Sequence, residues 1–122
     1  MLGYSAGCIK IWSVLSHMSS AFVNRWLHCV VSIAGAWHPE LLVTAGQKLL
    51  HSSALVLVHH HEADSLCCWS ERLAAFWAGL RKSLGCRMEV LLLHGKESTF
   101  VGHCYHDLFA QLCGLRAFWD LF

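Results

Sequence analysis

Charged residues are scarce in this sequence. Lysine, arginine, aspartate and glutamate together make up 14% of the 122 residues, and the formal net charge is +1 with neutral histidines. Lysines and arginines form no run, so electrostatic attraction to nucleic acid or to anionic lipid has no visible source. We therefore expect neither nucleic acid nor a membrane as a partner.

Paired cysteine motifs and long apolar runs are also missing. The seven cysteines are odd in number and show no C-x-x-C spacing, which argues against a disulfide framework and a zinc ribbon. No stretch of about eighteen uninterrupted apolar residues occurs, and the N-terminus has no positive region like that of a secretory signal. These absences predict a soluble, cytoplasmic protein with reduced, mostly buried thiols.

Apolar residues, in contrast, are abundant. They account for 56% of the chain, which is high for a free-standing soluble domain. A chain of this length is sufficient for one domain with its own core. We expect a single domain over residues 1–122 that exposes less of its surface than usual or lacks a partner.

The spacing of the apolar residues predicts helices that alternate with strands. In chain order we expect a helix over 8–16, a strand over 27–34, a helix over 39–50, a strand over 54–58, a helix over 66–84, a strand over 88–93 and a helix over 103–122. A helix over 21–34 is the competing interpretation of the second element. Helices that join apolar strands favour right-handed crossovers, and therefore an α/β fold with a parallel sheet flanked by helices.

The helix over 66–84 has several signals that agree. Its apolar residues share one face, and Arg81 and Lys82 lie in the last turn, where positive charge is favourable. Gly85 can close its C-terminus. Either Asp64 or Ser65 can accept hydrogen bonds from the first backbone N–H groups as the N-cap. We therefore expect this helix to begin directly after Asp64-Ser65.

The strongest chemical motif is the pentapeptide Gly3-Tyr4-Ser5-Ala6-Gly7, which has the pattern G-x-S-x-G. Such a pentapeptide holds a nucleophilic serine on a sharp turn between a strand and a helix. The turn forces the serine into strained backbone angles and leaves little room for side chains at the flanking glycines. Ser5 is therefore the candidate nucleophile.

The order of the segments after this motif resembles the C-terminal half of an α/β-hydrolase. The apolar strand Val30–Ala34 comes next, then Leu55–Val58 followed by the turn His60–Asp64, then an amphipathic helix, and then Met88–Leu93. In that family an acid lies in the turn after a late strand, a histidine lies in the loop after the last strand, and a final helix packs on the sheet. The resemblance implies a partial α/β-hydrolase fold that lacks its N-terminal strands.

The resemblance also implies a catalytic triad. A serine hydroxyl needs a histidine to take its proton and a carboxylate to orient that histidine. Asp64 matches the acid, with the N-cap role as its alternative. Spacing from the last strand puts the histidine near Ser98, and a serine cannot act as a base there. We choose His103 in the same loop as the base, with His94 and His106 as the alternatives.

These residues predict the transfer of an acyl group to water. Ser5 would attack an ester, or an amide or formamide, and the backbone N–H of Ala6 would donate a hydrogen bond to the oxyanion. No cofactor is implied. Only Met1 and Leu2 precede Gly3, whereas the family has further strands and a second oxyanion donor there. We therefore expect a fragment with weak or no activity alone, whose partners are a small-molecule substrate and either a missing N-terminal half or a second copy.

Two other functions stay open. His59–His61, Glu62, Asp64 and His94 follow neighbouring strands, so they could meet at one edge of the sheet, where imidazoles and carboxylates suit zinc or iron. The apolar composition and the serine at the histidine position favour instead a non-catalytic interaction module on a hydrolase-like scaffold.

Overall fold

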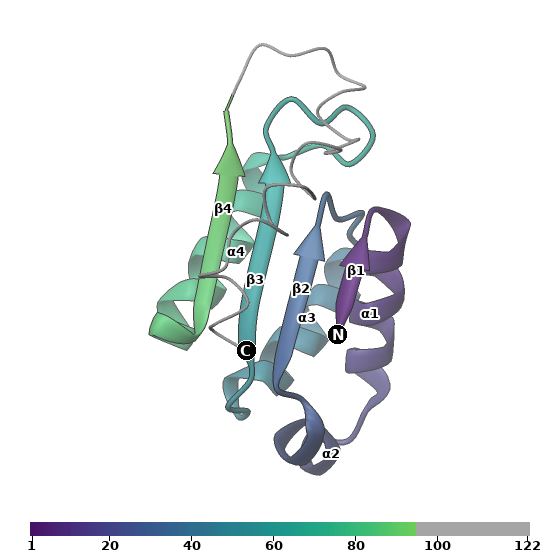
Figure 1. Ribbon diagram of the computed structural model, residues 1–122, viewed down its shortest axis with the longest axis vertical. Coiled ribbons are helices and arrows are strands. Elements are labelled where there is room, and N and C mark those ends of the chain that lie inside the picture. Colours follow the sequence, from purple (N-terminus) through teal and green to yellow (C-terminus); the bar gives the residue numbers. More distant parts are fainter. Residues whose placement is uncertain (95–122) are drawn as a thin grey trace, which may run out of the picture.

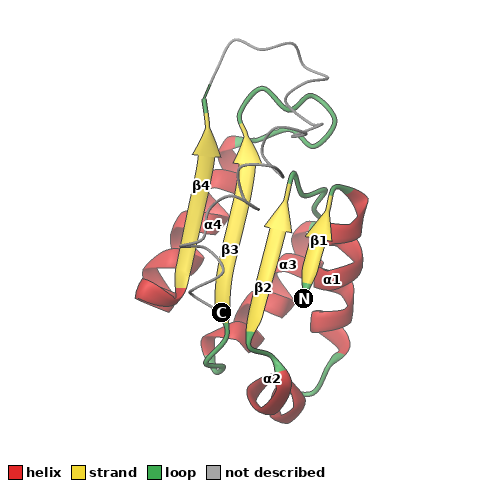
Figure 2. Ribbon diagram, in the orientation of Figure 1, coloured by secondary structure: helices red, strands yellow, loops and turns green. Residues whose placement is uncertain are grey.

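The protein folds around a sheet of four parallel strands (Figure 1; Figure 2). The computed structural model describes residues 1–94. Each strand pairs with the next one along the chain: β1 (Leu2–Tyr4), β2 (Cys29–Ile33), β3 (Leu55–His61) and β4 (Met88–Leu93). The predicted α/β class with a parallel sheet is therefore confirmed.

Three helices lie on the same face of this sheet (Figure 1), namely α1 (Ala6–His17), α3 (Pro39–Leu50) and α4 (Glu71–Leu84). A right-handed crossover between two parallel strands places its helix on one particular face of the sheet. Because each new strand is added on the same side of the previous one, all the crossovers place their helices on the same face. The short α2 (Ser20–Trp26) precedes β2, and the 3-10 turn η1 (Gly85–Arg87) precedes β4.

The main core lies between the sheet and these helices. Val56 and Val58 of the sheet pack in one cluster with Trp12 and Trp77, whose ring centroids are 5.6 Å apart. A second apolar cluster comprises Val31, Ile33, Ala34 and Leu57. Successive side chains of a strand point to opposite faces, so the same strands supply both clusters. This explains why these strands are continuous apolar runs in the sequence.

Several predicted elements are confirmed by the structure. α3 has Pro39 at its start, where a missing N–H costs no hydrogen bond within the helix. β4 spans Met88–Leu93 as expected. Gly85 closes α4 with a φ of 63°, a conformation that suits glycine. The predicted helix over 103–122 lies outside the described residues.

The two middle strands differ from the prediction in their limits. β2 begins at Cys29 rather than Leu27 because α2 runs to Trp26 and Leu27 is its C-cap. The competing helix over 21–34 is therefore wrong beyond Trp26. β3 extends past Val58 because its three histidines pair with Leu91–Leu93 of β4. The hydrogen bonds of the neighbouring strand, not the apolar pattern, determine where β3 ends.

α4 also begins later than predicted, at Glu71 rather than after Asp64-Ser65. The hydroxyl of Ser70 accepts a hydrogen bond from the Leu73 N–H over 3.1 Å, which is the contact of an N-cap. The segment between Asp64 and Ser70 is therefore a connection in front of the helix and not its first turn.

Candidate active site

Ser5 joins strand β1 to helix α1, since β1 ends at Tyr4 and α1 begins at Ala6. Its φ of 51° and ψ of −123° lie in a region that residues with a side chain rarely adopt. The Ser5 N–H donates to the Ile33 carbonyl over 3.0 Å, and the Ser5 carbonyl accepts from the Cys8 N–H over 3.0 Å. These bonds hold the serine on a sharp turn between a strand and a helix.

Of the two glycines in the pattern, only Gly3 is required by packing. A Cβ at Gly3 would lie 2.9 Å from the Cα of Cys8, closer than such carbons approach in proteins. A Cβ at Gly7 would meet no atom within 4 Å in the described part of the chain. The expectation that both flanks of the serine lack room is therefore right for Gly3 and wrong for Gly7.

Asp64 lies in the turn that follows β3, at the carboxyl edge of the sheet. It is only 2% exposed. Its Oδ1 accepts from the N–H of Leu66 over 2.9 Å and from the N–H of Cys67 over 2.8 Å, while its Oδ2 lies 4.0 Å from Nε2 of His60. The carboxylate therefore shapes the connection to α4 and does not cap that helix.

Cys67 links Asp64 to Ser5. Its backbone N–H donates to the Asp64 carboxylate, and its side chain is hydrogen-bonded to the side chain of Ser5. Its carbonyl oxygen lies 2.5 Å from Nε2 of His60. One residue thus contacts the candidate nucleophile, the candidate acid and a buried histidine. The fold has brought Ser5 and Asp64 to one place, although they lie far apart in the sequence.

The Cys67 thiol is itself a poor nucleophile. Burial raises its pKa, and the negative charge of Asp64 raises it further, whereas the hydrogen bond with Ser5 lowers it in part. The thiol is therefore protonated at neutral pH, and it is the thiolate that reacts. A protonated thiol also places no negative charge beside the serine.

The carboxylate that His94 contacts is that of Glu62 and not that of Asp64. The Nδ1 of His94 lies 2.7 Å from Oε2 of Glu62, and both side chains are exposed. His94 follows β4, whereas Ser5 follows β1 at the other end of the strand order. Neighbouring strands are about 4.8 Å apart, so roughly 14 Å separates the two strand ends. This position and the contact with Glu62 make His94 a weaker candidate for the base.

The other two candidates for the base, His103 and His106, lie outside residues 1–94, as does Ser98. Ala6 is the first residue of α1, so its N–H is one of the groups that a helix leaves without an acceptor of its own. These groups and the helix dipole make the N-terminus of α1 favourable for negative charge next to Ser5.

The histidines of β3 do not converge on a metal site. Consecutive residues of a strand alternate between its two faces. The His60 ring lies 5.2 Å from the Trp69 ring, on the helix side of the sheet. His59 is also buried, and burial, followed by the nearby His60 and His61, lowers its pKa to about 4. Residues 1–94 contain no group of three or more side chains that could hold a metal ion.

No family model, curated protein or solved structure was found to match this chain. The class of fold, a parallel α/β sheet with helices on one face, therefore follows from the topology alone. None of the helices within residues 1–94 is long and apolar enough to span a bilayer.

The sequence patterns did not reveal the role of Cys67. The hydrogen bond from the Cys67 N–H to Asp64 does have a local signal, because an aspartate commonly accepts hydrogen bonds from the N–H groups two and three residues later. The contact between the Cys67 thiol and Ser5 has no such signal, since it depends on how β1 and β3 are placed in the sheet.

Proposed function

We propose that the protein is a serine hydrolase that transfers acyl groups to water, with Ser5 as its nucleophile. The observation that carries this proposal is the strained backbone of Ser5 between β1 and α1. Such a conformation costs about 1–3 kcal/mol and is found mainly at functional sites. The turn also lies at the carboxyl edge of the parallel sheet, where α/β proteins bind ligands.

In the proposed reaction the Ser5 Oγ attacks the carbonyl carbon of an ester while a histidine takes the hydroxyl proton. The carbonyl oxygen becomes an oxyanion beside the N-terminus of α1, where the Ala6 N–H donates to it. The bond to the leaving group then breaks, the leaving alcohol takes the proton, and water hydrolyses the acyl-enzyme. An amide or formamide would react in the same way with an amine as the leaving group.

We assign Asp64 as the carboxylate that orients the histidine. Two backbone N–H groups hold its Oδ1, and Cys67 connects its turn to Ser5. His103 is assigned as the base from the resemblance to the α/β-hydrolases, and it lies outside the described residues. Ala6 is the one oxyanion donor assigned, and loss of a single donor slows such enzymes about 100- to 1000-fold. We therefore expect weak activity from this chain alone.

A fluorophosphonate probe tests this proposal, because it reacts with activated serines and not with ordinary ones. We expect the full-length protein to be labelled, Ser5→Ala to lose all labelling, and Asp64→Asn to be labelled at least about 100-fold more slowly. Ser53→Ala removes an exposed serine outside the site and serves as the matched control. Absence of labelling in wild-type protein that unfolds cooperatively would reject Ser5 as a nucleophile.

A non-catalytic interaction module is the second candidate function. β1 is the edge strand of the sheet formed by residues 1–94, and its Leu2 is 53% exposed. An edge strand with exposed apolar side chains favours pairing with another chain, such as a second copy of this one. Under this alternative the probe would label neither the wild type nor the variants.

A further inference from the structure

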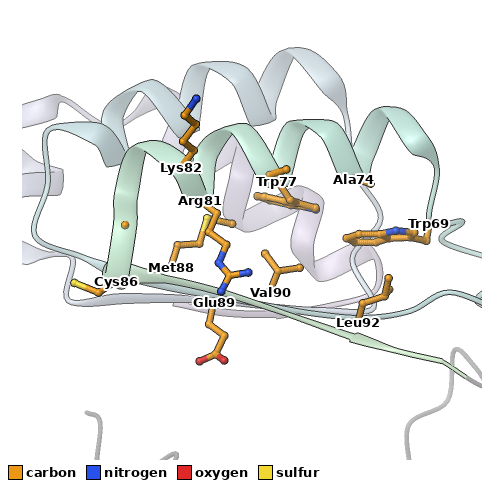
Figure 3. Close-up of a pocket in the computed structure, with 12 residues that line it drawn as sticks. Trp69, Ala74, Trp77, Arg81, Lys82, Cys86, Met88, Glu89, Val90 and Leu92 are labelled. Atoms are coloured by element: carbon orange, nitrogen blue, oxygen red, sulfur yellow. The ribbon is translucent and has the colours of Figure 1, made fainter.

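A groove runs between α4 and β4, at the end of the strand order opposite to Ser5 (Figure 3). Its volume of about 870 Å³ is in the range of small-molecule sites. Trp69 and side chains of α4 form one wall, and side chains of β4 form the other. Since β4 is the last strand of the described sheet, the groove lies along a sheet edge.

The inner part of the groove is apolar. Val90 and Leu92 extend from β4 towards the helix, and the rings of Trp69 and Trp77 lie on the opposite side of the groove (Figure 3). Trp77 is buried, whereas the other three side chains are only partly covered. An apolar ligand that covered them would remove this surface from water, which is favourable.

α4 has small side chains along this groove. Ala74 and Ala78 both line it, and they are four residues apart on one face of the helix. Arg81 follows three residues later on the same face. The two alanines leave space for a ligand between the indole of Trp69 and the guanidinium of Arg81.

Arg81 gives this space a positive end. Its guanidinium reaches from α4 towards β4, whereas Lys82 points away from the strand and the Glu89 carboxylate extends away from the helix (Figure 3). Within residues 1–94 Arg81 takes part in no ion pair. A guanidinium binds a carboxylate through two parallel N–H bonds, so the groove is complementary to an anionic head group of that shape.

We propose that this groove binds a single-chain carboxylate, with its head group on Arg81 and its apolar chain along Val90, Leu92 and the two tryptophans. A strand rises about 3.3 Å per residue, so Met88 to Leu92 spans about 13 Å, which suits a chain of medium length such as that of decanoate. The inference does not depend on the chemistry of Ser5.

Titration calorimetry of the full-length protein with sodium decanoate tests the proposed site. We expect Ala78→Leu to weaken binding at least about tenfold because the leucine fills the groove, and leucine is a good helix former at this exposed position. Ala75→Leu makes the same change at an exposed position of α4 that does not line the groove, and it should bind like the wild type.

The role of the charge is tested with the same ligand and with decanol, which has the same chain and a neutral head group. We expect Arg81→Glu to weaken decanoate binding about tenfold and to leave decanol binding unchanged. Arg72→Glu, an exposed charge of α4 outside the groove, is the control.

Three results would overturn the proposal. The first is no decanoate binding by folded wild-type protein, and the second is equal binding by Ala78→Leu and the wild type. The third is equal affinity for decanoate and decanol. Recruitment to vesicles of anionic phospholipid that Ala78→Leu abolishes, without binding of free decanoate, would assign the groove to a membrane and also contradict the proposal.

Discussion

Ser5 has backbone angles that glycine accepts more readily than any residue with a Cβ. We expect Ser5→Gly to be more stable than Ser5→Ala by about 1 kcal/mol. In an ordinary helix or strand the order is reversed, and a glycine variant is less stable than the alanine variant by about the same amount. Both variants lack the hydroxyl that bonds to Cys67, so that bond cancels in the comparison. Urea unfolding measures the difference, and a more stable alanine variant would show that the turn is not strained.

The two glycines around Ser5 should respond differently to the same substitution. Gly3→Ala places a Cβ 2.9 Å from the backbone of Cys8, and we expect a loss of about 1–3 kcal/mol in the free energy of unfolding. Gly7→Ala meets open space within α1, and we expect it to be neutral or to stabilise the protein by up to about 1 kcal/mol. Equal losses in both variants, measured by urea unfolding, would contradict the packing described for Gly3.

At the scale of elements, β3 makes the stability of the protein depend on pH through His59. The pKa of His59 is lowered to about 4 in the folded protein, mainly by burial, while the unfolded chain has the ordinary value of about 6.5. Between these values the unfolded state binds the proton and the folded state does not. The contribution of His59 to stability is therefore largest above pH 6.5 and decreases as the pH falls towards 4, by at most about 3 kcal/mol.

Urea unfolding between pH 4 and 7 measures this effect of His59. We expect His59→Gln to show a smaller loss of stability with falling pH than the wild type, because glutamine does not titrate. His51→Gln changes an exposed histidine and is the matched control. Identical pH dependence in His59→Gln and the wild type would show that the imidazole is equally easy to protonate in both states.

The start of α4 shows why one boundary could not be predicted locally. An aspartate that accepts from the N–H groups two and three residues later has the same chemistry in an N-cap and in a turn without a helix. Asp64 makes those contacts with Leu66 and Cys67. The chain does not continue into a helix there, and Cys67 instead contacts Ser5 and His60. Contacts with other elements, and not the Asp-Ser signal, determine where α4 begins.

At the scale of the whole molecule, the sheet of residues 1–94 ends at β1, with Leu2 and Tyr4 partly exposed on the edge strand. Such an edge favours association. We expect the protein to self-associate as its concentration rises and Leu2→Lys to weaken that association at least about tenfold, because a charged edge opposes strand pairing. Sedimentation velocity measures it. Lys10→Glu on the exposed face of α1 is the control, and a wild type that stays monomeric would contradict the expectation.

The order and type of α1 and of the elements from β2 to β4 followed from the sequence, because apolar residues recur with the period of a helix or form the short continuous runs of a buried strand. The short elements β1 and α2 were not predicted. The strained turn at Ser5 was also predictable, since its pattern is local. The contacts of the candidate site were not. Ser5 meets Cys67, and His94 meets Glu62, because particular strand ends lie at particular places along the sheet edge. Only the tertiary structure decides such contacts, since their distances depend on strand order and connection geometry rather than on neighbouring residues in the chain.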